Sequence, residues 1–141
     1  MEEIRIGGRT VPLTMTSWEL ETIQEEIGCT VGQLRDEVFG LEQDVETGEF
    51  RFGILGDGKK IRKFGSLIRI LGNAGLEEAG KDPDLTDKWV LRQIKPGMII
   101  PFVIAVSAVI IEAMKMEAGE KNEGPVDEIL EEENRKKEPE S

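Results

Sequence analysis

The sequence contains no histidine and no tyrosine, only one cysteine, and few aromatic residues, which make up 5% of its 141 positions. Histidine is the commonest general base at neutral pH and the commonest zinc ligand. The sequence therefore lacks the side chain most often used for either role. The single Cys29 cannot form an internal disulfide, which favours a reducing compartment. The remaining carboxylates, lysines and serines form no catalytic constellation. We therefore expect a protein that is not an enzyme and has no cofactor and no metal.

Basic residues are also scarce, with 18 lysines and arginines against 29 acids and a formal net charge of −11. Phosphate contacts need clustered cations, so the overall charge argues against sequence-independent binding of nucleic acid. A hydrophobic share of 38% and a charged share of 33% are typical of a soluble globular chain, and the length suits one domain. The start, MEEIRIGG, lacks the basic and then apolar run of a signal peptide. We expect a cytoplasmic protein.

Long apolar runs are limited to one segment, which extends for 14 residues from Met98 to Ile111. A membrane span needs about 20 residues, so a buried core helix is favoured over a membrane element. Pro101 fits the first turn of a helix, where its missing N–H costs little. The predicted helix therefore begins near residues 97–100 and continues to about Met116.

Two segments alternate apolar and polar residues as β-hairpins do. In residues 4–13 the turn is the pair Gly7-Gly8, which tolerates the positive φ angles of a two-residue turn. A second, less regular hairpin is expected from a strand at residues 43–46, a turn at Gly48 and a strand at residues 49–54. The rest of the domain has the signals of helices.

Capping signals and apolar spacing place these helices. Thr16 and Glu19 form a capping box. The Thr16 hydroxyl accepts a hydrogen bond from a free N–H group of the first helical turn, and the Glu19 carboxylate accepts one from the Thr16 N–H. The predicted helices extend from Thr16 to Gly28, from Thr30 to Gly40, from Ile61 to Leu71 and from Thr86 to Ile94. Glycines at 72 and 75 are expected to weaken the end of the third. These elements predict an α+β fold that is mostly helical, with the Ile99–Met114 helix at its centre.

The stretch GILGDGKK, residues 53–60, resembles the phosphate-binding signature G-x-x-x-x-G-K-[ST], with Gly53, Gly58 and Lys59 in register. Lys60 occupies the place of the hydroxyl that binds Mg²⁺ and cannot replace it. The preceding segment also alternates charge, unlike a buried parallel strand. We expect no nucleotide binding and interpret the glycines as a loop that leads into the Ile61 helix.

A basic cluster surrounds this loop and consists of Arg51, Lys59, Lys60, Arg62, Lys63 and Arg69. It is either a binding patch for an acidic partner or nucleic acid, or the solvated side of an amphipathic helix. The second interpretation is favoured, because no aromatic residues are interleaved to stack on bases. The acidic groups Glu21, Glu25, Glu26 and Glu131–Glu133 are interpreted as solvated helix faces and tail, and Cys29 as a small buried residue.

The composition changes at the C-terminus. Residues 118–141 contain nine acidic and four basic residues, a net charge of −5, and the only large apolar residues are Val126, Ile129 and Leu130. This composition is typical of a disordered acidic tail with at most a turn or two of helix around residues 127–134. The expected organisation is a globular domain at residues 1–117 and a flexible tail at 118–141.

The order of these elements resembles a known family. An I-x-I-G-G-R hairpin, a capped helix ending in E-E-x-G, a helix with LIRILGNAGL, D-P-D-L-T before another helix, and an apolar helix before a charged tail follow one another. This order resembles the tail assembly chaperones of long-tailed, non-contractile bacteriophages and their prophage relatives. The matching segments are Ile4–Leu13, Thr16–Gly28, Ile61–Leu76 and Asp82–Met116.

The resemblance implies a chaperone that binds and solubilises the tape measure protein, a very long helical chain, while tail tube subunits gather round it. It implies no catalytic residues, a location in the cytoplasm of the bacterial host, and absence from the mature virion. Many members also have a longer form made by a programmed frameshift. Two other classes stay open: a structural tail or connector component of the virion, and a small regulatory protein that binds nucleic acid through Lys59–Arg69.

The apolar helix is the candidate binding element. A helix that is apolar nearly all round is either wholly buried or shared with a partner, and full burial is hard to supply in a short chain. The two alternatives are therefore a core helix and a helix used for self-association or client binding. The candidate partner-binding residues are Ile99, Phe102, Ile104, Val106, Ile110, Ile111 and Met114.

Overall fold

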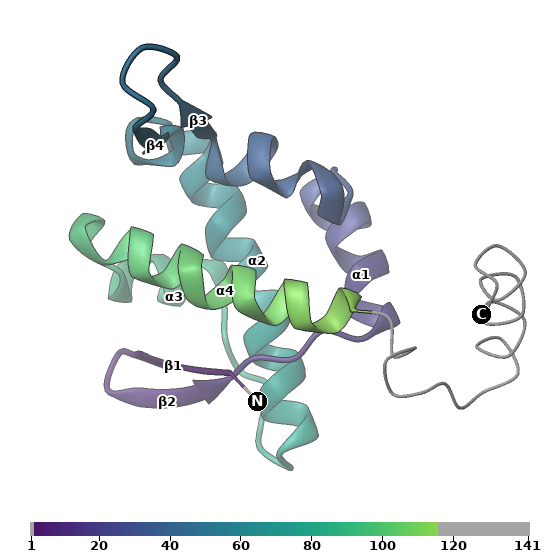
Figure 1. Cartoon of the computed structure of the whole chain (residues 1–141). Helices are drawn as coiled ribbons and strands as arrows, with labels where there is room; N and C mark the ends of the chain where they lie inside the picture. The colour runs from purple at the N-terminus through teal and green to yellow at the C-terminus, as the bar shows by residue number, and fades with distance from the viewer. Residues whose placement is uncertain (1, 116–141) are drawn as a thin grey trace, which may run out of the picture.

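The fold is built around one long helix, α2 (Gly58–Glu78), in the computed structural model, which describes residues 2–115. The first hairpin, the N-terminal helical turns and α3 (Asp87–Gln93) all contact α2. α4 (Ile99–Met114) crosses it, in green in Figure 1, and one side of α4 faces outward. The prediction that the apolar helix occupies the centre is therefore wrong, because α2 holds that place.

The structure is α+β and mostly helical, as predicted, with two separate two-stranded antiparallel hairpins. The remaining elements, in chain order, are β1 (Glu3–Ile6), β2 (Arg9–Pro12), α1 (Ser17–Thr22), η1 (Ile23–Ile27), η2 (Val31–Gln33), η3 (Arg35–Phe39), β3 (Leu41–Gln43), β4 (Phe50–Phe52), η4 (Gly53–Gly56) and η5 (Pro96–Met98). The two hairpins lie at opposite ends of the molecule (Figure 1). Buried apolar residues from the hairpin, the helical turns, α2, α3 and α4 form one core.

The first hairpin is confirmed. Gly7 and Gly8 form its turn with φ angles of 59° and 78°, which residues with a side chain rarely adopt. The register pairs Ile4 with Val11, and both side chains are buried on the face that meets α2 and α4. The ring of Trp89 packs so closely against Gly7 that a Cβ atom there would lie 2.6 Å from it.

The capping box of Thr16 and Glu19 is formed as expected. The Thr16 backbone N–H donates to Glu19 Oε1 at 2.8 Å, and the Trp18 backbone N–H donates to the Thr16 hydroxyl at 3.2 Å. The helix that begins there widens at η1 and ends at Gly28, whose φ angle is 88°. The next segment is a short pair of helical turns, η2 and η3, that ends at Gly40 with a φ angle of 62°.

The second hairpin exists, but its first strand ends earlier than predicted. β3 covers residues 41–43 rather than 43–46, so it shares only Gln43 with the predicted strand, and β4 covers residues 50–52 rather than 49–54. The reason is Asp44, whose carboxylate accepts hydrogen bonds from the backbone N–H groups of Glu46 at 2.8 Å and Thr47 at 3.2 Å. This local turn keeps residues 45–48 out of the strand pairing, which closes where the Asp44 N–H donates to the Glu49 carbonyl at 2.7 Å.

α2 is longer than predicted at both ends. It begins at Gly58 because the Asp57 carboxylate accepts from the N–H groups of Lys59 and Lys60, at 3.0 and 3.3 Å. It continues through Gly72 and Gly75, which the sequence predicted to weaken it. These glycines are points of close approach, since a Cβ atom on Gly75 would overlap the carbonyl group of Pro12.

The C-terminal helices agree with the sequence. Thr86 caps α3 by accepting from the Trp89 N–H at 3.1 Å, and η5 leads into α4 at Ile99. α4 ends at Met114, two residues before the predicted end. The predicted acidic tail, residues 118–141, lies outside the described residues.

Candidate functional site: an apolar groove beside α4

α4 has one buried side and one exposed side, and both are apolar. Its buried residues are Ile99, Phe102, Val103, Val106, Val109 and Ile110. On the outer side, the side chains of Ile104 and Ile111 are 61% and 62% exposed. They are seven residues apart, two helical turns, and therefore share one face of the helix. The helix is thus neither wholly buried nor an ordinary amphipathic helix.

The exposed isoleucines border a groove of about 520 Å³. On one side α4 contributes Val103, Ile104, Ser107, Ala108, Ile110 and Ile111. The facing wall comes from η2, η3 and the second hairpin and contains Val31, Leu34, Arg35, Phe39, Leu41 and Phe52. We call this feature the α4 groove.

The facing wall is held in place by packing against α2. The ring of Phe39 meets the ring of Phe64 edge to face, with 5.9 Å between the centroids and an angle of 79°. Leu41 and Phe52 are directly paired across the hairpin, so both side chains reach the groove together. Phe50, two residues before Phe52 on the same strand face, is 57% exposed and extends the apolar surface.

The lining limits the kind of ligand. Arg35 is its only charged residue and Ser107 its only hydroxyl, so few polar groups are available to orient a small polar molecule. Aliphatic and aromatic walls of this kind suit the apolar side of an amphipathic helix, which presents side chains at i, i+3, i+4 and i+7. The geometry therefore favours a polypeptide ligand.

The structure divides the seven residues predicted to bind a partner. Ile104, Ile110 and Ile111 line the α4 groove. Ile99, Phe102 and Val106 are buried in the core and cannot contact a partner without unfolding. Met114 is 52% exposed but borders a different hollow, with Leu20 and Met15.

The facing wall was missed by the sequence reasoning. Val31 and Leu34 belong to the helix predicted from Thr30 to Gly40, but the prediction of a helix does not show which element its apolar side contacts. Leu41 and Phe52 lie in the hairpin whose strand bounds were predicted least well. The alternation of Phe50 and Phe52 was a usable signal. Two aromatic side chains on one face of a short hairpin indicate that this face packs against another element or a partner.

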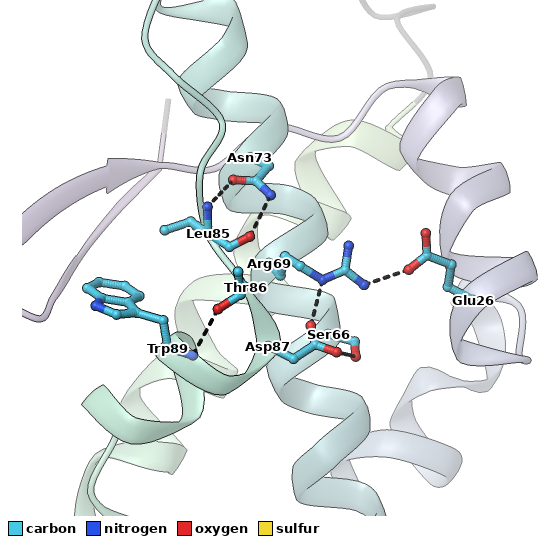
Figure 2. A network of polar contacts seen from close by, with 8 residues as sticks. All are labelled: Glu26, Ser66, Arg69, Asn73, Leu85, Thr86, Asp87 and Trp89. Atoms are coloured by element: carbon cyan, nitrogen blue, oxygen red, sulfur yellow. Dashed lines mark hydrogen bonds and ion pairs between the residues drawn. The ribbon is translucent and has the colours of Figure 1, made fainter.

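Two members of the basic cluster make contacts within the fold. Arg69 lies between Glu26 and Asp87 (Figure 2), and its guanidinium is 2.5 Å from each carboxylate. The Ser66 hydroxyl also donates to Asp87, at 2.8 Å. Burial by itself lowers the pKa of Arg69, but the hydrogen bonds from its guanidinium to the two carboxylates more than offset this and raise it. Arg69 therefore joins α2, η1 and the start of α3.

A second contact in the same region fixes the loop before α3. The side-chain amide of Asn73 bonds both backbone groups of Leu85, accepting from its N–H at 2.9 Å and donating to its carbonyl at 3.1 Å (Figure 2). Lys60, another member of the basic cluster, donates from Nζ to the carbonyls of Asp36 at 3.2 Å and Glu37 at 3.5 Å in η3. Two of the six cations are thus structural.

The glycines of residues 53–58 turn a corner, as the sequence predicted. β4 belongs to an antiparallel hairpin, and η4 leads from it directly to the Asp57 cap of α2. The Asp57 carboxylate occupies the N–H groups that a phosphate would need, and Lys60 points to η3 instead. The absence of nucleotide binding stays a prediction.

The remaining candidate groups have structural surroundings. Cys29 is buried, as predicted, and burial raises the pKa of its thiol, an effect that Lys63 opposes and Glu37 reinforces. Within residues 2–115 no three side chains of the His, Cys, Asp and Glu types are grouped to hold a metal ion.

Among the described helices, one is long and apolar enough to cross a membrane, by length and composition alone. It is the segment Pro96–Met114.

Comparison with family models, curated proteins and solved structures gives no match for this chain.

Proposed function

We propose that this protein is a phage tail assembly chaperone, whose α4 groove binds helical segments of the tape measure protein and keeps them soluble. The observation that carries the proposal is the outer side of α4, where Ile104 and Ile111 leave an apolar surface open beside an apolar wall. Monomeric soluble proteins seldom expose contiguous apolar surface unless it binds something. The order of elements on which the family resemblance rests is also the order of this fold.

A long helical client suits the groove because the groove is lined almost entirely by apolar side chains. Binding there depends on the shape and hydrophobicity of the client and little on particular polar groups. Aliphatic walls accept many amphipathic segments of different sequence, as a chaperone for a long chain requires. In this role the protein has no catalytic task, acts in the bacterial cytoplasm, helps to recruit tail tube subunits and leaves before the virion matures. Self-association through the same outer side of α4 is part of the proposal.

The test is co-purification with the client. The gene for the client would be recognised as a very long reading frame just downstream. In co-expression, Ile104→Glu or Ile111→Glu should reduce recovery of soluble client about tenfold or more, because a charge facing apolar walls is costly. Circular dichroism should show unchanged helical content for both variants, since both side chains are mostly exposed.

Leu55→Glu is the matched control, because Leu55 is 51% exposed but lies outside the groove lining. It should leave client recovery unchanged. Equal client recovery with all three variants would place binding elsewhere. Detection of the chain as a stoichiometric part of purified virions would instead identify a structural component.

A further inference from the structure

The α4 groove is open toward solvent in the described part of the chain, and α4 leads directly to the segment that lies outside it. Ile111, in the groove, is one turn before the last described residue, Lys115. The question is what covers the groove when no client is present. The chain itself carries a candidate within a short distance of α4.

Residues 125–137, PVDEILEEENRKK, have the sequence pattern of an amphipathic helix. Pro125 suits the first helical position, and acids follow it where the helix dipole favours negative charge. The three glutamates at 131–133 each precede a basic residue of 135–137 by four positions, the spacing and order that stabilise helices best. Val126, Ile129 and Leu130 fall on one face at i, i+3 and i+4.

We propose that residues 125–137 dock in the α4 groove of the same chain, with Val126, Ile129 and Leu130 against Ile104 and Ile111. The groove lacks acids and has one cation, Arg35, whereas the segment has five acids between residues 127 and 133. Arg35, the one charged group in the groove lining, is therefore a complementary partner for an acid that flanks the apolar face of the segment. Apolar pattern and charge both fit.

The tether has the right length for this contact. Eleven residue steps separate Lys115 from Val126, and a flexible chain of that length has an end-to-end distance of about 18 Å. The middle of the groove wall, at Ser107, is about 12 Å from Lys115 along the helix axis. A tether whose length matches its span gives an effective concentration of about a millimolar, which favours this segment over a second copy in dilute solution.

The docked segment is an internal competitor for any helical ligand of the groove. Under the proposed function it is the first occupant that a client must displace, which keeps the apolar surface covered between clients. The contact itself requires no client. Its test is therefore separate from the test of chaperone activity.

The experiment measures access to the groove in the full-length chain. Ile104→Cys is labelled with an uncharged maleimide, alone and combined with Ile129→Glu and Leu130→Glu, which remove the apolar face of the segment. Cys29 is buried, and its slow labelling is subtracted by measuring the unsubstituted chain. Breaking the contact should accelerate labelling at position 104 about threefold or more. A synthetic peptide of residues 125–137, added in excess, should restore protection.

Two matched controls accompany it. Leu55→Cys, at an exposed position outside the groove, is the first control. It should be labelled at the same rate whether residues 129 and 130 are native or both replaced by glutamate. Asn134→Glu adds a charge to the segment without removing an apolar side chain and should leave position 104 protected. Equal labelling rates at position 104 with and without Ile129→Glu and Leu130→Glu would overturn the proposal. Protection that disappears on dilution to nanomolar protein would overturn it too, by identifying a second copy as the cover.

Discussion

At the scale of single residues, Gly75 shows how closely β2 approaches α2. A Cβ atom there would overlap the carbonyl of Pro12, so Gly75→Ala should force the hairpin away and lower the free energy of unfolding by about 2–4 kcal/mol. Gly58→Ala is the control, because nothing lies within 4 Å of a Cβ at this first helical position. It should be neutral or add about 0.5–1 kcal/mol. Urea denaturation measures both, and equal midpoints would contradict the close approach.

Arg69 joins three segments of the fold, so its substitution should lower the free energy of unfolding. Arg69→Met keeps much of the aliphatic side chain but leaves Glu26 and Asp87 without their shared cation. Both carboxylates are partly solvated, so the expected loss in the free energy of unfolding is about 1–2 kcal/mol rather than that of a fully buried pair. Thermal unfolding checks this.

Arg62→Met is the control for Arg69→Met, since Arg62 is exposed on the same helix and forms no ion pair with any residue in the described range. It should change stability by less than about 0.5 kcal/mol. If the two variants lost the same stability, the ion pairs of Arg69 would be shown to contribute nothing.

At the scale of the element, α4 separates two adjacent isoleucines into different environments. Ile110 is 8% exposed and belongs to the core, whereas Ile111 is 62% exposed. Ile110→Ala should lower the free energy of unfolding by about 2–4 kcal/mol, because it leaves a cavity. Ile111→Ala should cost less than about 1 kcal/mol. Chemical denaturation of the two variants compares them, and similar losses would mean that the helix is rotated from the orientation described.

The same element shows why the sequence left two alternatives open for this helix. Apolar residues occupy nearly every side of it, so periodicity gives no preferred face. Contacts with β1 and the rest of the core decide which side is buried. Four of the seven residues predicted to bind a partner consequently lie in the core or at another hollow rather than in the groove.

At the scale of the whole molecule, the core formed within residues 2–115 extends from Ile4 to Ile110. Deleting residues 118–141 should therefore preserve helical content and a cooperative unfolding transition. The tail contact proposed above is weak, so the midpoint should move by less than about 4 °C, equivalent to about 1 kcal/mol. Circular dichroism during heating measures this, and loss of the transition would show that the tail completes the core.

The sequence by itself determined the features that depend on neighbours along the chain. The Gly7-Gly8 turn, the Thr16 and Thr86 caps and the helical ends at Gly28 and Gly40 follow from backbone geometry and hydrogen bonds within a few residues. These interactions are the same in any tertiary context, which is why the α+β class and most element positions were predicted correctly. The misplaced strand end at residue 46 also has a local cause, the Asp44 turn, which the sequence reasoning overlooked.

Tertiary structure alone decided which helix is central, what the glycines of α2 do, and where the α4 groove lies. Gly72 and Gly75 look like helix breakers until the hairpin and the loop before α3 are placed against them. The groove joins α4 to a wall more than fifty residues earlier in the chain, at residues 31–52. Local propensity contains no information about such a pairing, because the free energy that selects it comes from burying apolar surface between segments distant in sequence.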